Sequence, residues 1–255
     1  MATRTPLRLT VVSAGLSVPS STRLLADRLT DATRRALAAR GREVEVTVVE
    51  LRDLATDVAN NLVTGFPSRR LSDALASVSE ADGLIAVTPV FSASYSGLFK
   101  SFFDVVDNDA LTGTPVLAAA TGGTARHSLA LEHALRPLFT FLRAVVVPTA
   151  VYAAAEDWGG RGDSMTEGLP TRIERAAGEL ADLLAGRVHG DARAAVDVRA
   201  DGVRTNGARV DGDARVVDGR PAEETFVPFE QYLAALRPDQ PPDLIATDEP
   251  SGGLR

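Results

Sequence analysis

The stretch Thr88-Pro-Val-Phe-Ser-Ala-Ser-Tyr-Ser-Gly-Leu-Phe-Lys100 decides the fold class of this chain. It follows the apolar run Leu84–Val87, which predicts a buried strand, and after Gly97 its apolar residues take helical spacing. In open α/β sheets, ligands bind at such turns, beyond the carboxyl ends of the strands. Because Pro89 lacks an N–H and Gly97 permits close approach, this turn can form a thin, rigid wall around a flat ligand. Taken alone, an ordinary polar loop is the alternative.

A second candidate turn lies near the N-terminus. The run Leu7–Val12 predicts a strand, a turn rich in Ser and Thr follows, and a helix begins near Arg23. Hydroxyls beside a helix N-terminus form an anion site, because the free N–H groups and the helix dipole face the ligand. The turn lacks the glycine patterns of dinucleotide sites and P-loops, so it favours the phosphate of a mononucleotide. The alternative, compatible with phosphate binding, is that Ser20 or Ser21 caps the helix.

A third turn completes the pattern of an α/β domain. The strand Val116–Ala120 leads into Thr121-Gly122-Gly123, where paired glycines let backbone N–H groups reach the edge of a ligand. Further strands are predicted over 44–49 and 145–152, with further helices over 71–78, 129–142 and 169–187, and an irregular segment over 51–70. Strands separated by helices predict a parallel sheet with right-handed crossovers, and Pro148 favours an edge position for the last strand.

The helix predicted over 129–142 is apolar over a wide arc. This surplus favours a subunit interface, hence a homodimer or homotetramer, and a deeply buried helix is the alternative. Pro137 lies inside the pattern and predicts a kink.

Together these turns resemble those of the NAD(P)H-dependent FMN reductases, in the branch that is partnered with luciferase-like or alkanesulfonate-type monooxygenases. Residues 88–100 match the flavin loop of that family, Thr121–Thr124 followed by His127 match its second ring-binding loop, and the hydroxyl-rich turn matches its phosphate loop. The resemblance covers residues 7 to about 187. It implies an α/β flavodoxin-like three-layer sandwich with a five-stranded parallel sheet in the order 2-1-3-4-5.

The resemblance also implies the binding residues for FMN. Phosphate contacts fall on Ser13, Ser20, Ser21 and Thr22, and contacts to the ring and ribityl chain fall on Pro89, Val90, Phe91, Ser92, Tyr95, Ser96 and Gly97, with Thr121, Gly122 and Gly123 on the opposite side. His127 is expected to contact the loop or a neighbouring subunit. His133 stands where the flavin-transferring branch often has an extra residue that makes a π-bulge.

The implied activity is NAD(P)H-dependent reduction of FMN, with the reduced FMN supplied to a flavin-dependent monooxygenase. Hydride passes from the nicotinamide to the flavin, so we expect no catalytic side chain. Ser17-Val18 replace an arginine that the family often has, which leaves the choice between NADH and NADPH open. The alternatives are a quinone, azo or chromate reductase and, from another class, a flavodoxin-like electron carrier. Such carriers usually have a strongly acidic rim around the ligand. Here residues 188–255, with 13 acidic and 8 basic residues, hold −5 of the net charge of −7, so the acidic excess lies mostly outside the predicted reductase domain and the carrier is disfavoured.

Composition excludes several classes of function. The chain has no cysteine and its three histidines lack metal-ligand spacing, so metal and thiolate chemistry are not expected. Its negative charge disfavours nucleic acid. With no apolar run of membrane-spanning length and no signal-peptide pattern at the N-terminus, we expect a cytoplasmic protein that does not bind membranes.

The domain organisation predicted from the sequence has four parts. Residues 1–187 form the flavodoxin-like reductase domain, 188–225 a flexible linker or frail hairpin, 226–236 a short docking helix, and 237–255 a disordered tail. The linker is assigned because it lacks a long apolar run that could offset the entropy of ordering it.

Overall fold

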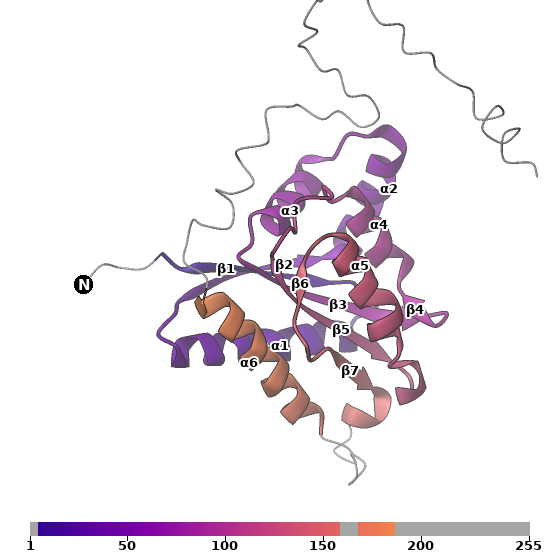
Figure 1. Cartoon of the computed structure of the whole chain (residues 1–255). Helices are drawn as coiled ribbons and strands as arrows, with labels where there is room; N and C mark the ends of the chain where they lie inside the picture. The colour runs from indigo at the N-terminus through magenta and orange to yellow at the C-terminus, as the bar shows by residue number, and fades with distance from the viewer. Residues whose placement is uncertain (1–4, 159–167, 187–255) are drawn as a thin grey trace, which may run out of the picture. The chain divides into compact units, whose positions relative to one another are not determined.

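The computed structural model describes residues 5–158 and 168–186. The predicted linker over 188–225, docking helix over 226–236 and tail over 237–255 lie outside the described residues. The described part is built around a mostly parallel sheet (Figure 1). Its strands are β1 (Leu7–Ser13), β2 (Val44–Glu50), β3 (Gly83–Phe91), β4 (Ser94–Tyr95), β5 (Pro115–Gly122), β6 (Val145–Val146) and β7 (Val151–Ala154).

The strand order confirms the predicted flavodoxin-like sheet. The parallel strands run β2-β1-β3-β5-β6, and β7 also pairs with β5. Counted by position, β6 and β7 share the fifth place of the order 2-1-3-4-5, with Pro148 in the connection between them. The structure thus differs from the single strand expected over 145–152. Proline cannot donate to a ladder, so the fifth strand at this edge is interrupted there.

Helices cover both faces of the sheet, as the predicted three-layer sandwich requires. One face carries α1 (Ser21–Ala39) and α6 (Leu169–Gly186), which lie side by side in Figure 1. The other face carries α2 (Ala55–Thr64), α3 (Arg69–Ser79), α4 (Gly97–Val105) and α5 (Arg136–Phe141). Side chains alternate along β3: Ile85 and Val87 pack with α1 and α6, and Leu84 and Ala86 pack with the opposite layer.

The expectation of an irregular segment over 51–70 was wrong. A 3₁₀ turn, η1 (Leu51–Leu54), leads directly into α2, and Leu51, Leu54 and Val58 are buried in the core. Gly65 ends α2 in the left-handed conformation, with φ 76°. The two asparagines at 60 and 61 lie inside this helix and not in a loop.

The segment over 129–142 is helical but not uniform. A π-helical turn, η3 (Leu131–Leu135), contains His133 and precedes α5. Pro137 lies in the first turn of α5, where a missing N–H is tolerated. Leu135 and Phe139 are buried, whereas Leu129 and Phe141 are 62% and 72% exposed. The wide apolar arc is therefore mostly buried, with Leu129 and Phe141 exposed near its two ends.

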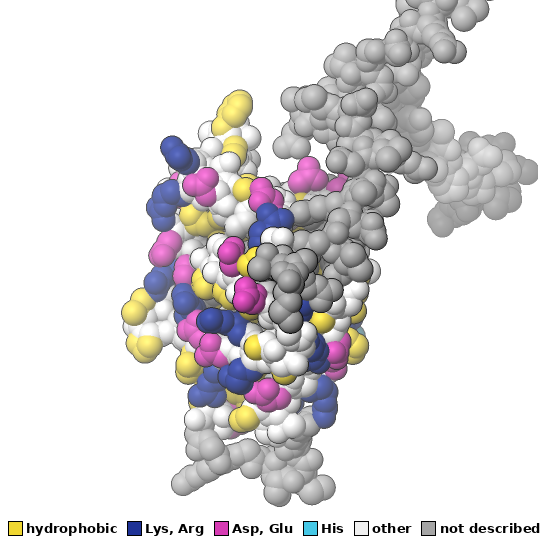
Figure 2. Space-filling model, turned by 90° about the vertical axis from the view of Figure 1, so that its left-hand side faces the viewer, with side chains coloured by type: hydrophobic (Ala, Val, Ile, Leu, Met, Phe, Trp, Pro, Cys, Tyr) yellow, Lys and Arg dark blue, Asp and Glu magenta, His cyan; other side chains and the backbone are white. Residues whose placement is uncertain are grey.

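Acidic and basic side chains are interspersed on the face of the described residues seen in Figure 2. Ion pairs such as Arg35–Glu174 and Arg40–Asp182 join α1 to α6. Among the described residues, no helix combines the length and hydrophobicity that crossing a membrane requires.

Candidate functional site

A cavity of about 540 Å³ lies where several strands end. It is lined by Leu16, Ser17, Ser21, Thr22, Pro89, Val90, Phe91, Thr121, Gly122, Gly123, Ala155 and Trp158. These residues lie at the carboxyl ends of β3 and β5, at the start of α1 and in the turns after β1, β5 and β7, so the chain brings together the three regions that the sequence predicted and adds a fourth. The size is in the range of cavities that bind cofactors.

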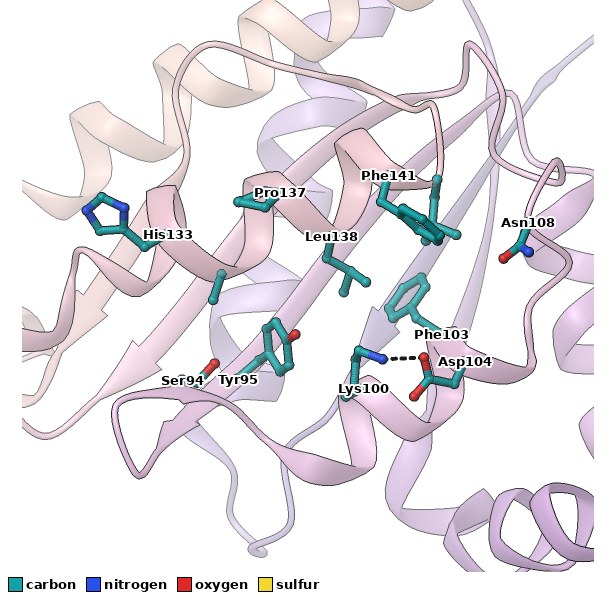
Figure 3. A pocket seen from close by; sticks show the side chains of 12 residues that line it. Ser94, Tyr95, Lys100, Phe103, Asp104, Asn108, His133, Pro137, Leu138 and Phe141 are labelled. Atoms are coloured by element: carbon teal, nitrogen blue, oxygen red, sulfur yellow. Dashed lines mark hydrogen bonds and ion pairs between the residues drawn. The ribbon is translucent and has the colours of Figure 1, made fainter. Parts of the chain in front are cut away.

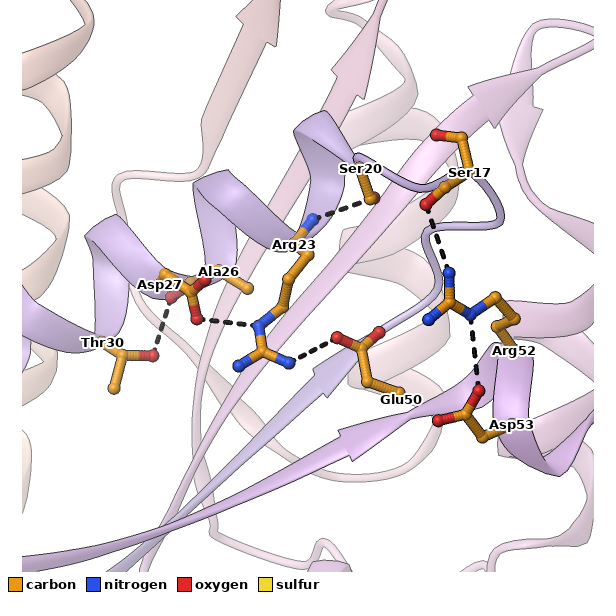
Figure 4. Close-up of polar contacts among 9 residues, drawn as sticks. All are labelled: Ser17, Ser20, Arg23, Ala26, Asp27, Thr30, Glu50, Arg52 and Asp53. Atoms are coloured by element: carbon orange, nitrogen blue, oxygen red, sulfur yellow. Dashed lines mark hydrogen bonds and ion pairs between the residues drawn. The ribbon is translucent and has the colours of Figure 1, made fainter.

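The first turn is fixed by the start of α1. The Ser20 hydroxyl caps the helix by accepting a hydrogen bond from the Arg23 N–H at 3.2 Å, as Figure 4 shows. The Thr22 and Thr121 hydroxyls are hydrogen-bonded at 2.8 Å, and both side chains are buried. This bond ties the first turn to the third. The N–H groups of Ser21 and Thr22 precede the first intrahelical bonds, and such groups are the donors of an anion site.

The second turn is a tight hairpin between β3 and β4. Ser92 and Ala93 both have positive φ, 48° and 67°, which is the geometry of a type I′ turn. Behind it, the buried Thr88 hydroxyl accepts a hydrogen bond from the Ser96 N–H at 3.1 Å. The Ser96 hydroxyl in turn caps α4 through the Phe99 N–H. These bonds hold Pro89, Val90 and Phe91 as one wall of the cavity.

The third turn is supported from below by Tyr152 on β7. Its hydroxyl donates to the Thr124 carbonyl at 3.0 Å, and a Cβ added at Gly122 would lie 2.0 Å from the same hydroxyl oxygen. Burial raises the pKa of Tyr152 above its ordinary value, so the side chain stays a neutral donor. A glycine is therefore required at 122, and the backbone of Gly122 and Gly123 forms the rim of the cavity.

Some of the predicted site residues do not line this cavity. Ser13 is fully buried at the end of β1, Ser20 lines a neighbouring cavity, and Ser92 lies at the exposed tip of the hairpin. Ser96 caps α4, Gly97 opens it, and His127 is exposed in the 3₁₀ turn η2 (Ala125–His127). Tyr95 lines a different cavity of about 440 Å³ between α4 and α5, shown in Figure 3.

The sequence reasoning missed four lining residues: Leu16, Ser17, Ala155 and Trp158. Ala155 and Trp158 belong to the 3₁₀ turn η4 (Ala155–Trp158), which continues β7 past the sheet. The Arg28 guanidinium lies over the Trp158 ring, 4.9 Å from its centre. The available signal was positional, because a turn after the fifth strand must open at the same edge as the other turns.

The donor set of this cavity fits FMN. Hydroxyls and helix N–H groups at Ser21 and Thr22 suit a phosphate, and Val90, Phe91 and Trp158 offer apolar walls for a flat ring. The buried Ser13 hydroxyl has no hydrogen-bond partner within the described residues, which makes it a donor available behind the first turn. In the part of the chain that the structure describes, no group of His, Cys, Asp and Glu side chains could hold a metal ion.

Comparisons with known proteins agree with this geometry. Residues 7–159 match the model of the family described as NADPH-dependent FMN reductase. The FMN reductase (NADPH) of Pseudomonas aeruginosa is 39% identical over 182 residues, which cover 71% of this chain and 95% of that protein. The NADH-dependent FMN reductase SfnF of Pseudomonas putida is 40% identical over 150 residues, 59% of this chain and 78% of that protein.

Solved structures show the same relationship. An oxidoreductase from Corynebacterium diphtheriae is 49% identical, with a TM-score of 0.68 over 72% of this chain and 99% of that chain. The apo form of the NADH:FMN oxidoreductase EmoB is 25% identical, with a TM-score of 0.59 over 71% of this chain and 91% of that chain.

Proposed function

The chain belongs to the NADPH-dependent FMN reductase family, and we propose that it uses NAD(P)H to reduce FMN for release to a flavin-dependent monooxygenase. The observation that supports the proposal is the cavity at the ends of β1, β3, β5 and β7, with neutral donors at one end and apolar walls beside them. When bound, FMN would supply the redox chemistry, which is the acceptance of hydride from NAD(P)H.

The chain contributes orientation and exclusion of water. In this proposal Ser21 and Thr22 hold the phosphate through their N–H groups and the Ser21 hydroxyl, and the backbone of Gly122 and Gly123 faces the ring edge. Phe91, which is 48% exposed, covers the outer side. No side chain has to give or take a proton in the hydride transfer. Holding the two reactants in contact is itself a large contribution to the rate.

Neutral donors also suit a flavin that must leave after reduction. Arg23, in the first turn of α1, is paired with Asp27 at 2.8 Å and with Glu50 at 2.5 Å. The FMN phosphate would then be held by hydrogen bonds from neutral groups and not by an ion pair with an arginine, which limits the affinity for FMN. A loosely held flavin favours a reductase that passes FMN on over a carrier that keeps it.

The proposal includes a homodimer or homotetramer in the cytoplasm. The exposed Leu129 and Phe141 flank the π-helical turn and α5, and the cavity of about 440 Å³ between α4 and α5 opens beside Phe141 (Figure 3). The exposed Phe141 beside this cavity supports an interface there, because exposed apolar surface often marks a protein contact.

The phosphate assignment is tested with Ser21→Asp. A carboxylate there repels the FMN phosphate, so we expect the Kd for FMN to rise roughly tenfold or more, with the Kd for riboflavin unchanged. Ser72→Asp, which places the same charge near the start of α3, is the control. Equal weakening of both flavins would contradict phosphate binding at Ser21, and turnover of NAD(P)H with FMN measures the activity itself.

A further inference from the structure

A second cavity, of about 390 Å³, lies on the other side of the first turn. It is lined by Gly15, Ser17, Val18, Pro19, Ser20, Arg23, Leu24, Asp27, Glu50 and Arg52. Ser17 lines both this cavity and the cavity of about 540 Å³ assigned to FMN, hereafter the flavin cavity, so the two adjoin at that residue. A ligand too long for the flavin cavity can therefore continue over the turn into the second one.

The two arginines of this second cavity differ in how their charge is used. Arg23 lies between Asp27 and Glu50, and its hydrogen bonds to these carboxylates, Glu50 first, raise its pKa (Figure 4). Its charge and those of its partners are thus largely satisfied. Arg52 forms an ion pair with the Asp53 carboxylate at 3.4 Å and donates to the Ser17 carbonyl at 3.4 Å. Both distances exceed the usual range of about 2.7–3.2 Å for N–H···O hydrogen bonds.

Beside these charged groups and the hydroxyls of Ser17 and Ser20, the lining has an apolar, exposed part. Val18 is 81% exposed and Leu24 is 44% exposed, with Pro19 between them in the lining. Together they give a platform without charge beside the Arg52 guanidinium. A flat base on the platform with a phosphate at the arginine matches this combination, because the planar guanidinium fork suits phosphate oxygens.

We propose that this second cavity binds the adenosine end of NADPH and that Arg52 binds its 2′-phosphate, which makes Arg52 the residue that sets the preference for NADPH over NADH. The inference rests on the proposed function and deepens it, since the relatives include both NADPH- and NADH-dependent reductases. The juxtaposition that supports it is a nucleotide-sized cavity that meets the flavin cavity at Ser17 and holds an arginine with only long contacts to its neighbours.

The first test is kinetic and uses the full chain with Arg52→Gln. We expect the KM for NADPH to rise roughly ten- to hundredfold, as for loss of a charge-assisted hydrogen bond, with the KM for NADH unchanged. Arg35→Gln removes an exposed arginine of α1 that is paired with Glu174 and should change neither value. An unchanged ratio of the two KM values in Arg52→Gln, or a wild-type protein that prefers NADH, would overturn the proposal.

The second test reads binding without activity and separates this inference from the proposed function. Adenosine 2′,5′-bisphosphate should bind the wild-type protein at least about tenfold more tightly than adenosine 5′-monophosphate, and Arg52→Gln should abolish that difference. If the two nucleotides bind the wild type equally, the adenosine site is wrong. If the protein binds the bisphosphate more tightly but reduces no FMN, the proposed function is wrong and the adenosine site is still supported. The Kd for FMN should be the same in Arg52→Gln, and a weakened Kd would assign Arg52 to support of the flavin turn instead.

Discussion

Gly122 and Tyr152 form the contact on which the third turn depends. The Tyr152 hydroxyl occupies the space that a Cβ at Gly122 would need, at 2.0 Å, whereas a Cβ at Gly123 would meet nothing within 4 Å. Two neighbouring glycines thus have different physical reasons to be glycine. Gly122 is required by packing, and Gly123 is compatible with a side chain unless a ligand lies against it.

We expect Gly122→Ala to reduce the free energy of unfolding by roughly 1–3 kcal/mol, because the tyrosine or the turn must move. Gly123→Ala is the matched control and should leave stability unchanged while weakening FMN. Adding Tyr152→Phe to Gly122→Ala should restore part of the loss, since the next ring atom lies 3.0 Å away. Denaturant unfolding that shows equal effects for the two alanines would contradict this packing.

At this scale the sequence was informative where a turn carried a recognisable pattern. Pro89, Thr121 and Gly122 were predicted to face the ligand and do line the cavity. Trp158 was not predicted, because nothing apart from the fold places it at the cavity, and Ser17 lies in the hydroxyl-rich turn but was not singled out from its neighbours. Ser20 has hydroxyl chemistry suited to phosphate and caps α1, but it lines the neighbouring cavity.

Among the elements, α1 and β5 are linked by a hydrogen bond that the sequence could not reveal. Thr22 and Thr121 are 2% and 3% exposed, and their hydroxyls meet at 2.8 Å. Both residues were assigned to the ligand, each in its own turn. The structure shows that each also fixes the position of the other turn, so the first and third turns keep a constant spacing across the cavity.

A double-mutant cycle measures this link. Thr121→Val alone should cost roughly 1–3 kcal/mol of unfolding free energy, because the Thr22 hydroxyl is left buried without a partner. Thr22→Val alone should cost a similar amount for the same reason. The double variant should be close to the wild type, since both polar groups are gone. Additive losses in urea unfolding would mean that the two hydroxyls are not coupled.

The elements themselves were largely predictable, and the exceptions have physical causes. The helix α2 was missed because Val58 is the one residue of it that is buried in the described structure, which leaves little apolar periodicity to detect. The single strand expected over 145–152 is interrupted near Pro148 because proline has no N–H for the ladder. The π-helical turn at Leu131–Leu135 agrees with the bulge that the family resemblance suggested near His133.

For the whole molecule, the exposed Leu129 and Phe141 of the segment 129–142 predict self-association. We expect Phe141→Glu to convert the oligomer into a monomer, because a charge would be buried in an apolar contact. Leu183→Glu, on α6 at the other face of the sheet, is the control and should leave the assembly intact. Light scattering at micromolar concentration that finds a monomeric wild-type protein, or an unchanged oligomer in Phe141→Glu, would contradict this interface.

The central claim is that the chain reduces FMN and releases it. The most direct measurement is anaerobic oxidation of NAD(P)H by the full chain, with and without added FMN, followed by ultrafiltration to recover free reduced FMN. Our account predicts oxidation that depends on added FMN, with reduced FMN in the filtrate in excess of the protein. Oxidation that does not respond to FMN, or reduced flavin that stays with the protein at one equivalent, would contradict it.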